Sequence, residues 1–179
     1  MIRSRGLAAS AVLLLVTAAV TLLAAAALTG CNSEEYVVAK IAPTQGNTAT
    51  GEIRFYKVEG GVRVVGKLEG LSPGLHGFHL HEKGDCSAPD AMSAGGHYNP
   101  AATPHGAPDA DSAHRHGGDL GNLEAGADGK APVDRMDRVL VYENLVGLAV
   151  LVHANPDDLT SQPAGNAGPR VGCGVIARR

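Results

Sequence analysis

Three histidines fall within seven residues, Leu75-His76-Gly77-Phe78-His79-Leu80-His81. In an extended strand the side chains alternate between two faces, so His79 and His81 would point to one side and Phe78 and Leu80 to the other. One face of such a strand can join a core, while the other presents two imidazoles to one metal ion. An isolated His-x-His pair is more often two surface histidines. A metal site therefore requires further ligands elsewhere in the chain.

Further candidate ligands lie mostly in a segment without regular periodicity. Residues 82–133 are dominated by Gly, Pro, Asp, Ser and His, and a structureless connection of this length is uncommon in a compact domain unless it is functional. Metal ligation would hold such a loop in place. The candidates stand beside glycine or at the end of an expected strand: His97, His105, His116, Asp119 and His153.

Short β-prone runs separated by turn residues predict the elements that would position these side chains. No sustained helical period occurs after residue 30, and we see neither an internal repeat nor a second domain, so the pattern predicts one all-β sandwich or barrel. The expected strands are 36–41, 51–58, 62–68, 75–81, 138–142, 147–153 and 173–177.

The composition agrees with many turns and short strands. The chain has 179 residues, with 24 Gly, 10 Pro, no Trp and only 3% aromatic residues. This length is sufficient for one domain with its own core. The net charge is −3 and no block of like charge occurs, so the sequence gives no support for a nucleic-acid partner.

The N-terminus predicts export. Arg3 and Arg5 precede an uncharged, apolar run from Gly6 to Gly30, as in a signal peptide. The following Leu28-Thr29-Gly30-Cys31 resembles the lipobox of bacterial lipoproteins. We therefore expect a signal peptide over 1–30, a lipid on Cys31 that attaches the protein to the cell membrane or outer membrane, and a short tether over 31–35. The alternatives are an uncleaved membrane anchor, since the run is long enough to span a bilayer, or cleavage without lipid, which gives a soluble periplasmic or secreted protein.

The cysteines fit this expectation. The chain has three cysteines, and an odd number in an exported protein needs an explanation. If Cys31 carries the lipid, Cys86 and Cys173 remain as an even pair in an oxidising compartment. A bridge between them would close a loop of about ninety residues and stabilise the fold by roughly 4–5 kcal/mol. Loss of Arg3 and Arg5 would reduce the basic residues from 15 to 13 against 18 acidic ones, a net charge of −5.

The motifs taken together resemble those of the copper/zinc superoxide dismutases. The likeness extends from about Tyr36 to Ile176 and implies an all-β fold, a flattened eight-stranded Greek-key β-barrel of immunoglobulin-like sandwich architecture, with long metal-binding and active-site loops. The matching segments are Gly74 to Glu82, Ser93 to Pro100, Gly118-Asp119-Leu120-Gly121-Asn122, Val152-His153 with Asp157-Asp158-Leu159, and Gly165 to Val175. The family domain would occupy 36–179.

The resemblance also implies the cofactors and the reaction. Copper would be held by His79, His81, His97 and His153, and zinc by His97, His105, His116 and Asp119, with His97 shared between the ions. Three imidazoles and one carboxylate suit a closed zinc site, and four imidazoles suit copper that changes oxidation state. The implied activity is dismutation of superoxide to O₂ and H₂O₂, in which His97 carries a proton and Arg170 binds the substrate anion.

Other residues would support the site. The resemblance implies that Asp157 links a copper histidine to a zinc histidine, that Cys86 and Cys173 form a disulfide, and that His76 has a structural role. His114 is a rival to His116 as a zinc ligand, and the spacing to Asp119 favours His116. Many relatives have guiding lysines in the segment matching residues 154–169. This chain has none there, so steering would depend on Arg170, or on Lys83 or Lys130.

Two other functions are compatible with parts of this pattern. A non-catalytic copper or zinc buffer would be favoured if Arg170 or a copper histidine were missing, and all are present. A copper-only dismutase would lack the zinc ligands, which His105, His116 and Asp119 supply. The sequence leaves the choice between monomer and homodimer open.

Overall fold

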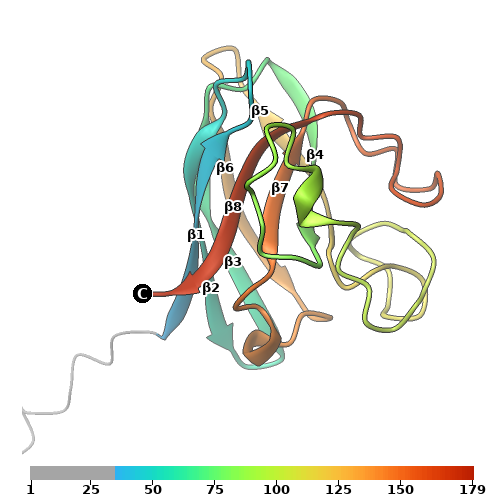
Figure 1. The fold of residues 1–179 in the computed structure, drawn as a ribbon. Coiled ribbons are helices and arrows are strands. Elements are labelled where there is room, and N and C mark those ends of the chain that lie inside the picture. The colour runs from blue at the N-terminus through green and yellow to red at the C-terminus, as the bar shows by residue number, and fades with distance from the viewer. Residues whose placement is uncertain (1–34) are drawn as a thin grey trace, which may run out of the picture. The chain divides into compact units, whose positions relative to one another are not determined.

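The computed structural model describes residues 35–179; the expected signal segment, Cys31 and most of the expected tether lie outside the described residues. Eight antiparallel strands curl into a nearly closed barrel in the order β5-β4-β7-β8-β1-β2-β3-β6 (Figure 1). The predicted all-β class is therefore confirmed. The strands are β1 (Tyr36–Pro43), β2 (Thr50–Val58), β3 (Gly61–Glu69), β4 (Gly74–His81), β5 (Asp119–Ala125), β6 (Ala131–Asp137), β7 (Ala149–His153) and β8 (Arg170–Arg178); the 3-10 helices are η2 (Met92–Ala94) and η3 (Tyr142–Asn144).

Side-chain alternation along β4 separates the core from the candidate site. Phe78 and Leu80 are completely buried inside the barrel, while His79 and His81 lie on the opposite face of the strand. The same alternation in β7 sends Val150 and Val152 into the core. Apolar residues from all eight strands complete this core, among them Ile53, Phe55, Val64, Leu120, Val133 and Ile176.

The Arg135 side chain joins the end strands β5 and β6 across the seam between them. The Arg135 guanidinium of β6 donates hydrogen bonds to the backbone carbonyls of Leu120 and Asn122 in β5, the latter at 2.8 Å. The same guanidinium lies 5.8 Å from the ring centroid of Phe78. A cation over an aromatic face is favourable, so Arg135 links the two edge strands to the core beneath them.

The expected strand over 138–142 is wrong, although its residues are β-prone. Both Val139 and Leu140 donate their backbone N–H to the carboxylate of Asp137, at 2.8 and 2.9 Å. This side-chain acceptor replaces a neighbouring strand and turns the chain at the end of β6. Conversely, β5 lies wholly and β6 partly within the segment 82–133 expected to be irregular, because their polar residues and Pro132 obscure the apolar alternation.

Two long connections, 82–118 and 154–169, cover the outer face of β4 and β7 (Figure 1). A small apolar cluster fixes the first connection to this face: Ala91 and Ala94 pack against Ala149, Leu151 and Cys173. The predicted disulfide is confirmed, because Cys86 in the connection is bonded to Cys173 in β8 with a Cα–Cα distance of 5.9 Å. The loop is therefore held to the barrel by packing and by a covalent bond.

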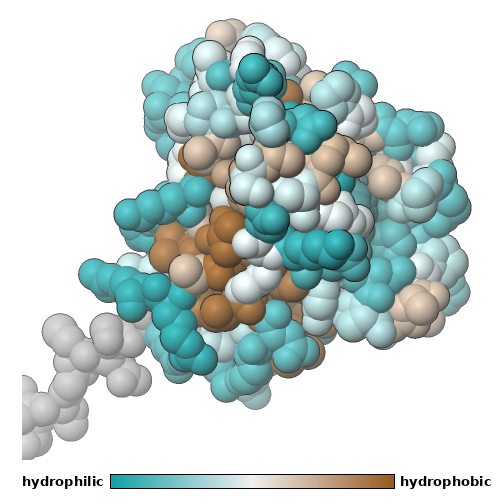
Figure 2. All heavy atoms as spheres, in the orientation of Figure 1, coloured by the Kyte–Doolittle hydropathy of each residue, from teal (hydrophilic) through white to brown (hydrophobic). Residues whose placement is uncertain are grey.

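Apolar side chains also gather on the outer face formed by β1 and β8 (Figure 2). Val38 and Val175 share a shallow hollow there, and Val175 is 38% exposed. Val146 is 43% exposed and precedes Gly147, which donates its N–H to the Ile176 carbonyl at 3.0 Å. Across residues 35–179, no helix is long and apolar enough to cross a membrane.

Candidate metal centre

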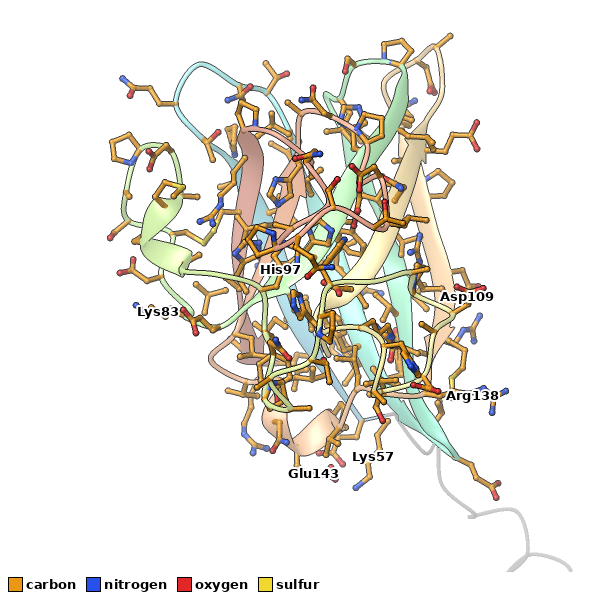
Figure 3. The ribbon with its side chains drawn as sticks, turned by 90° about the vertical axis from the view of Figure 1, so that its right-hand side faces the viewer. Lys57, Lys83, His97, Asp109, Arg138 and Glu143 are labelled. Atoms are coloured by element: carbon orange, nitrogen blue, oxygen red, sulfur yellow. A yellow bond between two sulfur atoms is a disulfide. The ribbon has the colours of Figure 1, made fainter. Side chains whose placement is uncertain are left out.

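Two clusters of potential metal ligands lie side by side and share one residue. The first cluster is His79, His81, His97 and His153, and the second is His97, His105, His116 and Asp119. Within each cluster, one ligand atom from every residue lies within 4.8 Å of the others. Figure 3 shows His97 between the barrel and the loops that cover it. The structure thus brings together all seven residues expected from the sequence to hold metal.

Backbone pairing places His97 beside the histidine strand. Beyond Gly77 the β4–β5 register shifts. Leu80 then donates to the Gly118 carbonyl at 2.9 Å and accepts from the Tyr98 N–H at 2.8 Å, and His81 forms an isolated bridge with His97. Loop residues therefore continue the sheet where β5 leaves it. A Cβ on Gly118 would lie 2.3 Å from the Leu80 carbonyl oxygen, so this close approach requires glycine.

Hydrogen bonds fix which nitrogen each histidine of the first cluster presents. Nδ1 of His81 donates to the Gly95 carbonyl at 2.9 Å, and Nδ1 of His153 donates to the Gly168 carbonyl at 3.0 Å. Because a carbonyl can only accept, the Nε2 lone pair of each ring stays free. The buried nitrogens of this cluster without a partner in the described structure are Nδ1 of His79 and Nε2 of His81, His97 and His153. Four unpartnered imidazole nitrogens facing one another fit a metal ion.

His97 faces both clusters with its two nitrogens. Its Nε2 is free in the first cluster, while its Nδ1 lies 2.7 Å from Oδ1 of Asp119 and 3.4 Å from Nδ1 of His116 in the second. The Asp119 carboxylate also accepts the backbone N–H groups of Gly106 and His116, at 3.1 and 2.8 Å. An imidazole in this position can contact a different metal ion through each nitrogen.

Asp157 connects the clusters a second time. Its Oδ2 accepts from Nε2 of His79 at 2.7 Å, and its Oδ1 accepts from Nε2 of His105 at 3.0 Å. Each bond leaves the other ring nitrogen, Nδ1, available to a metal. Nδ1 of His105 is buried without a hydrogen bond and lies 3.0 Å from Oδ2 of Asp119. The fully buried Asp157 carboxylate therefore sets the orientation of one ring in each cluster.

Burial and the two carboxylates act in opposite directions on the histidine charges. Burial lowers the pKa of His79 to about 4, of His81 to about 2 and of His153 to about 3, so these rings stay neutral, as metal ligands must be. Burial also opposes a charge on His105, but the adjacent carboxylates of Asp119 and Asp157 outweigh it and raise the pKa of His105 to about 9. The second cluster therefore attracts positive charge, which suits a divalent cation.

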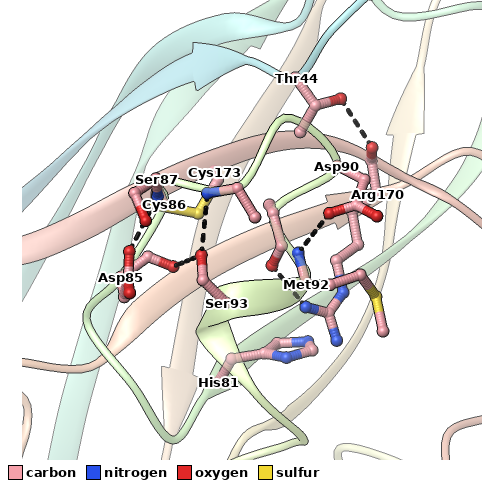
Figure 4. The surroundings of a disulfide bond; sticks show 12 residues. Thr44, His81, Asp85, Cys86, Ser87, Asp90, Met92, Ser93, Arg170 and Cys173 are labelled. Atoms are coloured by element: carbon pink, nitrogen blue, oxygen red, sulfur yellow. Dashed lines mark hydrogen bonds between the residues drawn. A yellow bond between two sulfur atoms is a disulfide. The ribbon is translucent and has the colours of Figure 1, made fainter.

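Arg170 lies beside the first cluster in a cleft of about 900 Å³, where the lining includes His81, His97 and His153. Its guanidinium donates to the carbonyls of Ala91 and Gly95, at 2.6 Å each. Both carbonyls belong to the loop that the Cys86–Cys173 bridge attaches to β8, three residues after Arg170 (Figure 4). Burial lowers the pKa of Arg170, which is opposed by the nearby Asp90. Arginine remains charged, so the cleft contains a fixed cation beside the histidines.

Some charged residues near the cleft line it, whereas others point away from it. Among the described residues that line it, Arg170 and Asp90 carry the formal charges other than histidine. Asp158 in the neighbouring loop points its carboxylate at its own loop, where it accepts from Ser161 N–H at 2.8 Å and Asn166 Nδ2 at 3.0 Å. These hydrogen bonds lower the pKa of Asp158, so the group stays ionised.

The two remaining histidines lie outside both clusters. His76 is buried, with Nδ1 2.7 Å from the His153 carbonyl and Nε2 2.8 Å from the Ser72 carbonyl, so it connects β4 to the end of β7. The His114 side chain is 75% exposed and pairs with Asp111 at 2.7 Å. The structure thus places His116 rather than His114 with Asp119.

Sequence reasoning missed three side chains that hold these ligands. Arg115 is buried, pairs with Asp137 at 2.7 Å and donates to the Asp119 carbonyl at 2.8 Å. Asn122 hydrogen-bonds the backbone of Asp157, and Gln162 does the same with His105. Asn122 lies in one of the recognised motifs. No local signal distinguishes Arg115 or Gln162 from an ordinary loop residue.

Comparison with known proteins gives matches over nearly the whole barrel. A family model described as copper/zinc superoxide dismutase matches residues 49–176. A protein of Onchocerca volvulus named superoxide dismutase [Cu-Zn] is 43% identical over 151 residues, which are 76% of this chain and 94% of the relative. The crystal structure of the clock protein EA4 is similar with a TM-score of 0.71 and 36% identity, covering 84% of this chain and 98% of that one.

Proposed function

The chain belongs to the copper/zinc superoxide dismutase family, so it converts two superoxide anions and two protons to O₂ and H₂O₂, and we propose that the first cluster holds its copper and the second its zinc. Four neutral imidazoles in the first cluster suit copper. Three imidazoles with the Asp119 carboxylate suit a closed tetrahedral zinc site. The observation that carries this assignment is His97, which presents Nε2 to one cluster and Nδ1 to the other.

The residues around the clusters have defined tasks in this proposal. Bound copper supplies the one-electron redox chemistry. Arg170 binds the superoxide anion electrostatically, because two of its nitrogens are fixed by carbonyls and the charge cannot be lost. His97 carries a proton at Nε2, beside the cleft, for transfer to the reduced substrate. Asp157 keeps the rings of His79 and His105 in their ligating orientation.

A superoxide assay with metal analysis tests this assignment. We expect one copper and one zinc per chain in the wild type, loss of copper and activity in His153→Ala, and preferential loss of zinc in His105→Ala. Full copper loading without dismutation would instead favour a metal buffer. Arg170→Gln should retain both metals and lose about 10–100-fold in rate, the cost of a hydrogen-bonded charge.

We also propose that the enzyme is exported and lipid-anchored through Cys31, and that it protects the cell envelope from superoxide. Two features support this: the basic start and apolar run that precede the lipobox-like Leu28-Thr29-Gly30-Cys31, and the disulfide, which occupies both other cysteines. A mass measurement of the mature N-terminus should show a lipid on Cys31 that is lost in Cys31→Ser. An unmodified mature chain would support the soluble alternative.

We propose that the apolar face on β1 and β8 forms the contact between the two copies of a homodimer. The exposed Val175 and the half-buried Val38 share a hollow on this face, and exposed apolar surface is typical of a protein contact. Sedimentation of wild type and Val175→Glu tests the idea: the wild type should sediment as a dimer and the variant as a monomer. A monomeric wild type would reject it.

A further inference from the structure

The side chain of Gln162 clamps the backbone of His105. Its Nε2 donates to the His105 carbonyl at 2.9 Å, and its Oε1 accepts from the His105 N–H at 2.9 Å. The two residues are 57 positions apart, and Gln162 is exposed while His105 is 3% exposed. A surface side chain that satisfies both backbone groups of a buried candidate ligand holds that ligand in place.

The loop that carries Gln162 is internally cross-linked. The Asp158 carboxylate accepts the N–H groups of Thr160 and Ser161, at 3.0 and 2.8 Å, and Nδ2 of Asn166 at 3.0 Å. The Gly165 N–H donates to the Ser161 carbonyl at 2.7 Å. These bonds join both halves of residues 158–166, so the segment can shift as one body.

The same segment contacts His105 in two further places. Asp157, directly before it, binds Nε2 of His105, and the Asp157 backbone is itself fixed by the Asn122 side chain through bonds of 2.9 and 2.7 Å. Gly165 lies so close that a Cβ there would be 2.7 Å from Nε2 of His105. His105 is thus enclosed by one loop on its backbone side and on its ring side.

The residues after Gln162 form part of the cleft wall. Pro163, Ala164, Gly168 and Pro169 line the cleft together with Arg170. A displacement of His105 would therefore be transmitted through Gln162 to the wall beside the anion-binding guanidinium. We propose that Gln162 is a positioning residue that couples zinc binding at the second cluster to the shape of the substrate cleft. This inference rests on the zinc assignment proposed above.

Glutamine variants of the full protein test the coupling. Gln162→Met removes both hydrogen bonds at similar size, and Gln162→Glu keeps only the acceptor. Gln45→Met is a matched control, since Gln45 also lines the cleft and its side chain has no hydrogen bond within residues 35–179. The first readout is the rate of Zn²⁺ transfer from copper-free, zinc-loaded protein to a chelator. The second is amide hydrogen exchange at Ala164 and Gly165, with and without Zn²⁺.

We expect zinc transfer about 10–100-fold faster in Gln162→Met, an intermediate rate in Gln162→Glu and the wild-type rate in Gln45→Met. Zinc should slow exchange at Ala164 and Gly165 in the wild type and the control, but not in Gln162→Met, with urea unfolding used to confirm that each metal-free protein is folded under the conditions of the exchange. If Gln162→Met transfers zinc at the wild-type rate and still shows zinc-dependent protection, the coupling is overturned while the zinc assignment stands. A wild type that binds no zinc would overturn the zinc assignment as well.

Discussion

His81 and Arg170 donate hydrogen bonds to the same acceptor, the carbonyl oxygen of Gly95, at 2.9 and 2.6 Å. One peptide group therefore sets both the ring of a proposed copper ligand and the guanidinium proposed to bind the substrate. Gly95 has a φ of +76°, and a Cβ there would lie 2.5 Å from Oε1 of Glu82. The position of this carbonyl thus depends on glycine.

Substitution of Gly95 by Ala should disturb both groups at once. We expect a loss of about 1–3 kcal/mol in the free energy of unfolding, from the left-handed backbone and the contact with Glu82, and a fall of roughly 10-fold or more in the rate constant for superoxide. Gly96→Ala is the control, because a Cβ at Gly96 meets nothing within 4 Å. Urea unfolding and stopped-flow decay of superoxide measure the two effects. Equal behaviour of the two variants would contradict the prediction.

Asp157→Asn should weaken both metal sites. An amide presents one acceptor oxygen, whereas the carboxylate accepts from both His79 and His105. Loss of such a partner typically costs about 10–100-fold in metal affinity. Chelator competition for copper and for zinc measures this, with Asp158→Asn as the neighbouring control, whose carboxylate bonds only to its own loop. Unchanged affinities in Asp157→Asn would refute the bridging role.

The rate should depend weakly on ionic strength. Residues 154–169 contain no lysine, and Arg170 is accompanied in the cleft by Asp90, so a long-range attractive field for an anion is small. We expect a shallower decrease with salt than in relatives that have lysines in the corresponding loop. Rate constants between low and high NaCl measure the slope. A steep decrease would point to steering by Lys83 or Lys130, and Lys83→Gln and Lys130→Gln would identify which.

The metal-free protein should be most stable near pH 6.5. An unfolded histidine has a pKa of about 6.5, whereas burial lowers the pKa of His79, His81 and His153 to about 4, 2 and 3. Their contribution is complete above pH 6.5 and is lost as the pH falls, by up to about 1.4 kcal/mol per pH unit for each ring. The pKa of His105 is raised to about 9, so its effect on stability has the opposite sign: the contribution is complete below pH 6.5 and is lost between pH 6.5 and 9.

Urea unfolding of the metal-free protein at a series of pH values measures this dependence. Stability should decrease on both sides of the maximum, and His81→Leu should decrease less steeply on the acid side, because one of the three rings no longer titrates. A stability that stays constant between pH 5 and 6.5 would rule out neutral, buried rings.

Local sequence was sufficient where the side-chain pattern has a local cause. The alternation that separates His79 and His81 from Phe78 and Leu80 follows from strand geometry alone, and the structure has it. The strand expected at 138–142 failed, because Asp137 offers its carboxylate to the next two N–H groups that follow Arg138. The Asp137 carboxylate thus competes with a neighbouring strand for these N–H groups. The outcome depends on how β6 ends, and β-propensity carries no information about that.

The supporting side chains could not be inferred in the same way. Gln162 and His105 are 57 residues apart, and Asn122 and Asp157 are 35 apart. The pairing of each side-chain amide with its backbone partner depends on how the two long connections pack over β4 and β7. The ligand set and the linking role of Asp157 were predicted from the resemblance to a family, whereas the contacts of Arg115, Asn122 and Gln162 were identified only in the folded chain.

The Arg135 guanidinium has a consequence beyond completing the barrel. β5 is an end strand, and the carbonyls of Leu120 and Asn122 would otherwise be available to a strand from another molecule. Unprotected strand edges are templates for aggregation. Because the donor comes from β6 of the same chain, those acceptors are occupied before another chain can reach them. Arg135 thus protects β5, the edge strand that carries the proposed zinc ligand Asp119, from self-association.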